Sequence, residues 1–488
     1  MQPDVIIIGS GMGGATMASK LAPTGRNIVI LEAGDYLRPS AMDRDAEAIF
    51  AKGYYRPDEM WLDGNDAPFN PGNYYNVGGN SKFYGAVLAR YRAEDFSPIK
   101  HLEGTTHGWP MSYDTLEPYY QAAETLYQVR GQLIEDPTEP YHSGQYPFEP
   151  VPDEPSIADL RVRLATLGLH PASLPLGVDL GAWLAGGQTA WDAFPNTKGG
   201  KIDAETPLAK ALQHPNVTLR TNTKVRRLIA DANQTVSGVE VDDNGEVLSG
   251  STVVLAAGAV QTAALLLRSG LANGSDQVGR NFMNHNTSAI IALHPFWRND
   301  AIYQKTLMVN DFYLKGGPNG EPLGNMQLLG KITGPILAAN TPLPRLIANF
   351  VARRTVDLYA MSEDLPDPES RVTLSGDQIK LDWKKSNGKA HDLLVKRLKT
   401  LLRKAGYPVV MSRAFDRRTP SHQCGTARMG NDPRTSVVDP FGRSHDHPNL
   451  FICDASILPT SAAVNPALTI AALALRSGDH IIQTQFAA

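Results

Sequence analysis

The chain has 488 residues, of which 42% are hydrophobic and 20% charged, so its composition excludes a disordered or fibrous protein. Its 46 lysines and arginines against 50 aspartates and glutamates give a net charge of -4, which argues against nucleic acid and membrane partners. Cys424 and Cys453 are its two cysteines and are too widely spaced for an iron–sulfur cluster or a zinc site, so we expect no metal. An N-terminus without a basic leader, and no apolar stretch of roughly 18 residues, favour a cytoplasmic protein.

The N-terminal residues predict a strand, a glycine-rich turn and a helix in that order. Val5–Ile8 is a short β-branched run, typical of a strand that is buried on both faces of a parallel sheet. Glycines at positions 9, 11 and 14 follow it as GxGxxG, and Ala15–Leu21 reads as a helix. In such a turn the first glycine allows the tight bend, the second lets a diphosphate approach the backbone, and the third lets the helix pack closely.

A second strand and an acidic residue strengthen this prediction. Taken alone, a GxGxxG motif is equally well explained by an ordinary glycine-rich loop. Here Asn27–Leu31 reads as a buried strand and is followed by Glu32, 18 residues past the third glycine at position 14. In dinucleotide-binding folds an acid near this offset binds a ribose hydroxyl. The complete order predicts a dinucleotide site, and its position at the very N-terminus, followed by Ala33 and Gly34, favours FAD over NAD.

The next part of the chain is rich in loops. A polar excursion runs from residue 35 to residue 72 and is expected to form part of a lid, and Val77–Ser81 is a second glycine turn. Residues 134–201 are rich in proline and glycine, with one helix predicted at Ile157–Leu167. Long loops of this kind are usually functional or disordered, and here we expect them to wall a pocket.

Strand patterns recur later in the chain and predict a second, largely antiparallel sheet between about residues 290 and 410. The strands predicted for this sheet are Ser288–Leu293 and Gln378–Trp383, and earlier strands are predicted at Val217–Arg220, Val236–Val241 and Val253–Leu255. A helix is expected at Ala263–Arg268, and a second at Ala390–Ala405 has apolar residues on one face and basic residues on the other. The second helix could lie on a membrane, but the acidic chain favours a helix that covers the sheet.

Two C-terminal segments single out one of the 12 histidines. The first, His422–Gly430, reads HQCGTARMG. The second, Asn449–Thr469, contains a buried strand, an aspartate and the sequence NPALT before an apolar helix. Most histidines in a chain of this size are structural. His422 is a candidate because it belongs to one of these two segments.

At these segments the chain resembles the glucose-methanol-choline (GMC) oxidoreductases, and it does so along its whole length. The motifs that occur in the family's order are Gly9–Gly14, Val77–Ser81, Gly108–Tyr120, Gly279–His285, His422–Gly430 and Asn465–Thr469. Within the family the nearest resemblance is to the branch of pyranose oxidases, bacterial glycoside 3-oxidases and sugar dehydrogenase large subunits. The resemblance implies an α/β fold, with a Rossmann-like FAD-binding domain interleaved with an α+β substrate domain on a largely antiparallel sheet.

The resemblance also assigns a catalytic pair. His422 matches the family's catalytic histidine, and Asn465 matches its partner, where many relatives have a second histidine. The pair suits the chemistry, because oxidation of a C–OH group removes the hydroxyl proton as hydride leaves for flavin N5, and a histidine with an ordinary pKa near 6.5 is a suitable base. A neutral amide can hold the same oxygen without competing for the proton.

The expected cofactor-binding residues come from the same motifs. They are Gly9, Gly11, Met12, Gly13, Gly14, Glu32, Ala33, Gly79, Asn80, Ser81, Val225, Ala257, Asp454, Ala455, Asn465, Pro466 and Ala467. Asp454 matches the acid that bonds the ribityl chain of the flavin, with the cap of a turn as the alternative. For His285, a structural tie between the two domains is favoured. Phe83 stands where some pyranose oxidases attach FAD through a histidine, so non-covalent FAD is expected.

The resemblance predicts two interleaved domains and a reaction. The expected FAD-binding domain comprises residues 1–36, 72–130, 206–288 and 410–488, and the substrate-binding domain comprises residues 37–71, 131–205 and 289–409. The expected reaction oxidises a secondary hydroxyl of a sugar or glycoside, at C2 or C3 of a pyranose, to a ketone. Oxygen or a quinone or dye-type acceptor would take the electrons, and the oligomeric state stays open.

Other functions stay open at this point. The same site could oxidise a primary, aryl, sterol or polyol alcohol. Polar residues such as Asn325 and Gln327 favour a sugar, whereas an apolar neighbour such as Phe312 leaves an aryl or sterol substrate possible. A flavin-binding protein without turnover is the alternative from another class, and the intact pair of His422 and Asn465 argues against it.

Overall fold

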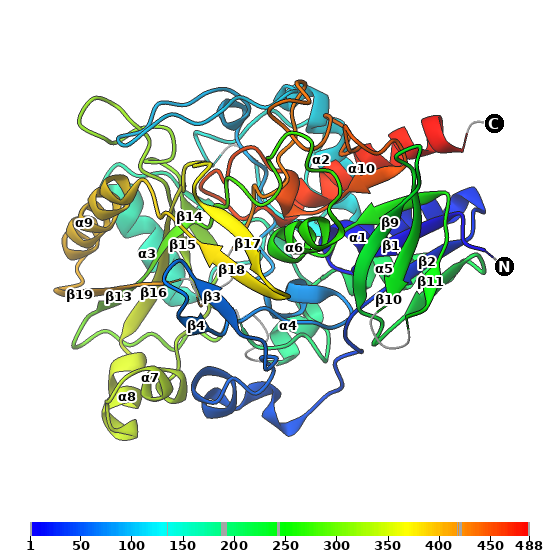
Figure 1. The fold of residues 1–488 in the computed structure, drawn as a ribbon. Helices are drawn as coiled ribbons and strands as arrows, with labels where there is room; N and C mark the ends of the chain where they lie inside the picture. The colour runs from blue at the N-terminus through cyan, green and yellow to red at the C-terminus, as the bar shows by residue number, and fades with distance from the viewer. Residues whose placement is uncertain are drawn as a thin grey trace.

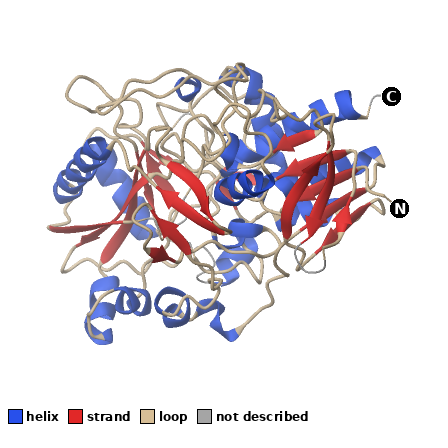
Figure 2. Cartoon of the chain, viewed as in Figure 1, coloured by secondary structure: helices blue, strands red, loops and turns tan. Residues whose placement is uncertain are grey.

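A computed structural model shows two groups of strands on opposite sides of the molecule, with helices packed around and between them (Figure 1, Figure 2). It describes residues 2–133, 135–186, 193–241, 245–416, 418 and 422–486. None of the helices within these ranges is long and apolar enough to cross a membrane.

The first group of strands contains a five-stranded parallel sheet in the order β20-β12-β1-β2-β8. Its strands are β1 (Val5–Ile8), β2 (Ile28–Leu31), β8 (Val217–Arg220), β12 (Thr252–Leu255) and β20 (Leu450–Ile452). Every residue of β1, β12 and β20 is buried, as expected for apolar runs in a sheet that is covered on both faces. Because the sheet takes strands from both ends of the chain, its first and last segments fold together.

Helices and a small sheet surround these strands. The helices are α1 (Met12–Leu21), α2 (Tyr113–Leu126), α5 (Glu205–Ala211), α6 (Ala259–Ser269) and α10 (Ala467–Gln485). Helix α1 packs against α5 and α10, and α10 packs in turn against α2. The small sheet is antiparallel, has the order β11-β10-β9 and packs against α6. Its strands are β9 (Val225–Ala230), β10 (Val236–Val241) and β11 (Val247–Leu248).

The second group contains a six-stranded antiparallel sheet in the order β19-β13-β16-β15-β14-β6. Its strands are β6 (Pro171–Ser173), β13 (Asn286–Leu293), β14 (Leu307–Val309), β15 (Asn325–Leu328), β16 (Thr355–Ser362) and β19 (Val409–Ala414). Helix α9 (Gly388–Lys404) packs against β13, β16 and β19 through Ala390, Leu394, Leu398 and Leu402, which are buried. The amphipathic helix predicted here therefore covers the sheet.

The remaining elements lie outside these three sheets. A four-stranded sheet in the order β17-β18-β3-β4 joins strands from the polar excursion to strands from the second half of the chain. Its strands are β3 (Trp61–Asp63), β4 (Pro68–Phe69), β17 (Arg371–Ser375) and β18 (Gln378–Asp382). The other elements are β5 (Val129–Arg130), β7 (Leu176–Gly177), α3 (Pro155–Thr166), α4 (Leu180–Gly186), α7 (Gly334–Asn340) and α8 (Arg345–Ala352).

The structure confirms the predicted fold class, a Rossmann-like α/β fold interleaved with a largely antiparallel sheet. The domain boundaries stay a prediction. The carboxyl ends of β1, β2, β12 and β20 lie at one edge of the parallel sheet, which is where ligands bind in open α/β folds. The chain segments that follow these four strands are therefore the place to look for a site.

Candidate active site

Glycines allow helix α1 to press against the ends of the central strands. Gly9 has a φ of +100°, and a Cβ there would lie 2.4 Å from the carbonyl oxygen of Ala256. A Cβ on Gly13 would lie 1.6 Å from the carbonyl oxygen of Cys453, and one on Gly14 would lie 2.0 Å from that of Gly9. Real Cβ atoms do not approach backbone so closely, so these positions require glycine.

The first turn of α1 fits the diphosphate of FAD. A Cβ built on Gly11, the N-cap residue, would meet no atom within 4 Å, so this glycine borders open space. Glycine also has no side chain that could cap the helix, which leaves the first N–H groups for a ligand. Those N–H groups and the positive end of the helix dipole attract a phosphate group. Gly11, Met12 and Gly13 are therefore placed as a diphosphate site requires.

Glu32 lies at the carboxyl end of β2 and is buried. Its Oε2 accepts hydrogen bonds from the backbone N–H of Ser10 (3.0 Å) and the Ser10 hydroxyl (2.7 Å), and its Oε1 accepts one from the N–H of Gly34 (3.1 Å). Burial raises the pKa of the Glu32 carboxyl, and these hydrogen bonds oppose the increase. Both carboxylate oxygens thus already accept hydrogen bonds from the protein, and the contact of Glu32 with a ribose hydroxyl stays a prediction.

The segment that follows β8 brings the predicted adenine contact close to the same place. The N–H of Thr223 donates to the carbonyl oxygen of Glu32 at 2.8 Å. Val225, two residues later, begins β9 and is buried. The start of β9 therefore lies near the carboxyl end of β2, and the contacts of Ala33 and Val225 with the cofactor stay a prediction.

The second glycine turn lies against the first. Gly78 has a φ of +88°, and its N–H donates to the hydroxyl of Ser10 at 3.1 Å. A Cβ on Gly79 would lie 3.4 Å from the Cα of Gly11. The two turns are therefore joined through the Ser10 hydroxyl, and at Gly79 and Gly11 their backbones approach closely.

The side chains of Asn80 and Ser81 hold this turn in shape. The Asn80 side chain accepts a hydrogen bond from the N–H of Tyr74 (2.9 Å) and is exposed. The Ser81 hydroxyl donates to the carbonyl oxygen of Gly78 (2.6 Å) and accepts from the N–H of Ala204 (3.1 Å). The contacts of these two residues with the cofactor stay a prediction.

Asp454 follows β20 and is bonded to groups of the protein. Its carboxylate accepts from the N–H of Ser456 (2.8 Å), which is the turn cap considered as the alternative. It also accepts from the hydroxyl of Thr262 (2.6 Å) and the N–H of Gly258 (3.0 Å), the residue after Ala257. Burial raises the pKa of Asp454, and the bonds to Ser456 and Thr262 oppose this. Asp454 thus ties the end of β20 to the start of α6, and its bond to the ribityl chain stays a prediction.

His422 and Asn465 lie side by side. Nε2 of His422 is 3.2 Å from Nδ2 of Asn465, and both residues are half-buried. His422 has a φ of +70°, a left-handed conformation that is strained for a residue with a side chain. Asn465 and Pro466 directly precede α10, whose first residue is Ala467, and proline cannot cap the helix with its side chain. The free N–H groups of this helix terminus suit a group that becomes negatively charged on reduction.

Backbone contacts place His422. The N–H of Cys424 donates to the carbonyl oxygen of Met283 (2.9 Å), and the N–H of Met283 donates to that of Cys424 (3.0 Å). The N–H of Gly425 donates to the carbonyl oxygen of Ala455 (3.1 Å). Gly425 has a φ of +91°, and a Cβ there would lie 2.3 Å from the carbonyl oxygen of Asn281. Residues 422–425 are therefore fixed between residues 281–285 and the end of β20.

This arrangement brings a second histidine, His285, against His422. Their Nδ1 atoms are 2.8 Å apart, and the ring planes meet at 73°. His285 is buried, and its Nε2 lies 2.8 Å from the carbonyl oxygen of Ser461. Burial lowers the pKa of His285 to about 4. Burial, followed by the charges of His285 and Lys305, holds the pKa of His422 well below its usual range, so both rings are neutral at neutral pH.

The sequence does not place two of these residues at the site. It favours a structural tie for His285, whose position at the end of the GRNFMNH motif, directly before β13, is the signal that points to the site. Lys305 has no such signal. It is buried, and its charge lowers the pKa of His422, but a single lysine in a loop has no pattern that marks it.

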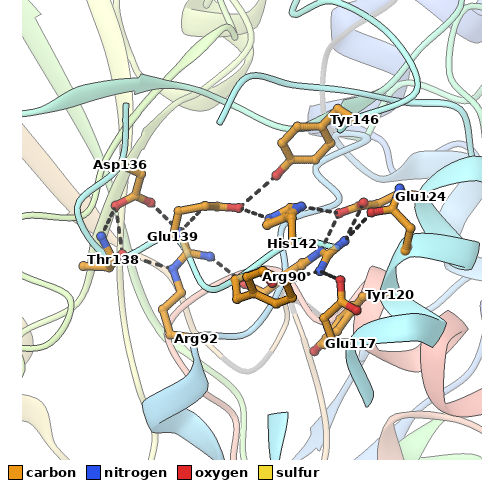
Figure 3. Close-up of polar contacts among 12 residues, drawn as sticks. Arg90, Arg92, Glu117, Tyr120, Glu124, Asp136, Thr138, Glu139, His142 and Tyr146 are labelled. Atoms are coloured by element: carbon orange, nitrogen blue, oxygen red, sulfur yellow. Dashed lines mark hydrogen bonds and ion pairs between the residues drawn. The ribbon is translucent and has the colours of Figure 1, made fainter. Parts of the chain in front are cut away.

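A buried network of charges surrounds Arg90 and Arg92 (Figure 3). Arg90 donates to both oxygens of Glu124 (2.7 Å each), and Arg92 pairs with Asp136 (2.5 Å). The side chains of Arg90, Arg92 and Glu124 are completely buried. Further members of the network are Glu117, Thr138, Glu139, His142 and Tyr146. Between the two arginines lies Tyr91, whose hydroxyl donates to the carbonyl oxygen of Ser461 at 2.9 Å.

Family models match three parts of the chain. Residues 185–287 and 366–474 match the N-terminal and C-terminal models described as GMC oxidoreductase. Residues 7–53 match the NAD(P)-binding Rossmann-like domain.

Similar proteins cover the chain almost completely. It is 30% identical to paromamine 6'-oxidase of Streptomyces fradiae, over 98% of this chain and 91% of that protein. It is 28% identical to the fructose dehydrogenase large subunit of Gluconobacter japonicus, over 99% and 98%. The crystal structure of pyridoxine 4-oxidase from Mesorbium loti has a TM-score of 0.68 and 18% identity, with both chains fully covered, and so shares the fold.

Proposed function

Because the chain belongs to the GMC oxidoreductases, FAD-dependent enzymes that act on CH–OH groups, we propose that it oxidises a secondary ring hydroxyl of a sugar or glycoside to a ketone. The proposed position is C2 or C3 of a pyranose. We also propose His422 and Asn465 as the catalytic pair and the predicted glycine turns, Glu32 and Asp454 as the main cofactor contacts.

The observation that carries this proposal is the pair itself. A substrate hydroxyl that meets Nε2 of His422 also meets the amide N–H of Asn465, because these two atoms are only 3.2 Å apart. His422 then takes the hydroxyl proton, while Asn465 holds the oxygen and orients the C–H bond. When bound, FAD accepts the hydride from that carbon.

Two electrostatic features bear on this role. The pKa of His422 lies well below the usual range, which keeps the ring unprotonated at neutral pH and also makes it a weaker base. The charge of Lys305 contributes to that decrease, and the same positive charge stabilises the negative oxygen that forms as the hydroxyl loses its proton. The protonated ring in this buried place is a strong acid and gives its proton up again readily.

The wall of the six-stranded sheet supports a polar substrate. Met326 and Leu328 of β15 belong to the same apolar core as Leu394 of α9. Side chains alternate along a strand, so Asn325 and Gln327 lie on the opposite face, away from α9. Figure 1 shows α9 on the side of this sheet that is remote from the parallel sheet, so the polar face is turned inward. Amide side chains there suit the hydroxyls of a sugar better than a sterol or an aryl ring.

A primary hydroxyl of a sugar derivative is the second candidate. The observation that favours it is the relative named paromamine 6'-oxidase, whose name assigns oxidation to the 6' position of its substrate. The relative named fructose dehydrogenase large subunit supports a sugar without deciding the position.

Anaerobic reduction of the flavin tests the proposal. Sugars and glycosides, added in turn to the purified holoenzyme without oxygen, are expected to bleach its visible absorbance, and the product is expected to be a ketone at C2 or C3. An aldehyde product would favour the primary position. Bleaching by aryl alcohols or sterols alone would contradict the proposal. Repeated turnover with oxygen and with a quinone then identifies the electron acceptor.

We propose further that FAD is bound without a covalent link. Phe83 has no nucleophilic atom, and its ring stacks on Tyr74 with centroids 3.7 Å apart. Acid precipitation of the holoenzyme is therefore expected to leave all flavin in the supernatant. A yellow protein pellet would show a covalent attachment.

A further inference from the structure

We propose that His285 is a positioning residue: it holds His422 in the tautomer whose Nε2 is unprotonated and directed at Asn465. This inference rests on the proposed role of His422 as the base. A histidine accepts a proton only through a nitrogen that carries none, so the tautomer decides which nitrogen can work.

Four residues form a series of hydrogen bonds: the carbonyl group of Ser461, His285, His422 and Asn465. The tautomer of His422 follows from the Ser461 end of this series. A carbonyl oxygen can only accept, so Nε2 of His285, 2.8 Å from that of Ser461, must carry a proton. The buried His285 ring is neutral because its pKa is lowered to about 4, so its Nδ1 has a lone pair. Nδ1 of His422, 2.8 Å away, must therefore be the donor. A neutral His422 that carries its proton on Nδ1 has none on Nε2.

The Asn465 end gives the same answer independently. An amide nitrogen donates and does not accept, so Nδ2 of Asn465, 3.2 Å from Nε2 of His422, requires a lone pair on that Nε2. The two ends of the series thus agree on the tautomer of His422.

The carbonyl group of Ser461, at which this series of hydrogen bonds begins, is itself held in place. The carbonyl oxygen of Ser461 accepts a second hydrogen bond from the hydroxyl of Tyr91 (2.9 Å). The Ser461 hydroxyl accepts from the N–H of Asp364 (3.1 Å), and the N–H of Ala462 donates to Glu363 (3.0 Å). The carbonyl that orients His285 is therefore anchored from several sides.

Two substitutions separate this role from simple packing. In His285→Leu the acceptor for Nδ1 of His422 is lost, so the tautomer with a protonated Nε2 is expected to become the major form, and the rate of flavin reduction is expected to fall roughly 10–100-fold. In His285→Asn the side-chain oxygen is attached to Cγ, as Nδ1 is in histidine, and provides an acceptor again. This variant is expected to recover most of the rate.

Nitrogen NMR of the substrate-free holoenzyme, labelled with ¹⁵N at histidine, reads the tautomer directly. The His422 signals are assigned by their loss in His422→Ala and are expected to show a protonated Nδ1 and an unprotonated Nε2. A protonated Nε2 in the native enzyme, or an unchanged tautomer in a folded, FAD-containing His285→Leu variant, would overturn the proposal. Because no substrate is present, this result is separate from the success or failure of the proposed sugar oxidation.

Discussion

Replacement of His422 by alanine is expected to lower the rate of flavin reduction by about 10²–10⁴-fold while FAD stays bound. The neutral ring is the group that can take the hydroxyl proton next to Asn465, and alanine leaves that proton without an acceptor. The predicted diphosphate and ribose contacts come from the turns around Gly11 and from Glu32, which the substitution does not touch. Rapid mixing with substrate under anaerobic conditions, scaled to bound flavin, measures the effect.

His391 provides a matched control for this variant. It is buried, contacts the hydroxyls of Ser288 and Ser362, and has a pKa lowered by burial to about 4. It lies in the first turn of α9, and in the described part of the chain it has no contact with His422. His391→Ala is therefore expected to lower stability but to keep the reduction rate per flavin. An undiminished rate in His422→Ala would remove that residue from the role of base.

Local patterns in the sequence are enough to predict the cofactor side of the site. The bend at Gly9, the close approach at Gly13 and the strand before them occupy one short stretch, and each has its own residue signature. The apolar face of α9 is readable in the same way, because its buried residues recur with the period of a helix.

The contact between His285 and His422 has no such local cause. The two residues are 137 positions apart, and they meet because Met283 and Cys424 exchange backbone hydrogen bonds that side-chain patterns do not encode. The pairing of β3, which lies in the polar excursion, with β18 is likewise not encoded in a local sequence pattern. Charged residues are usually exposed, so the complete burial of Arg90 contradicts what its residue type predicts.

The second large effect concerns Arg90. Replacement by methionine is expected to lower the free energy of unfolding by about 3–5 kcal/mol, because it leaves buried carboxylates without their partner. Arg90 contacts Glu124 at 2.7 Å and Glu117 at 3.1 Å, and the side chains of Arg90 and Glu124 have no exposed surface (Figure 3). Methionine fills part of the volume but supplies neither the charge nor the donors.

Denaturant unfolding of the holoenzyme measures this loss, with the same excess of FAD in every sample because bound ligand stabilises the folded state. The double variant Arg90→Met/Glu124→Met is the control. It removes the carboxylate that the single variant leaves uncompensated, so it is expected to be more stable than Arg90→Met alone. Equal unfolding of Arg90→Met and the native protein would show that Glu124 finds another partner or a proton. A double variant less stable than Arg90→Met would show that the two side chains stabilise the fold by packing and not as an ion pair.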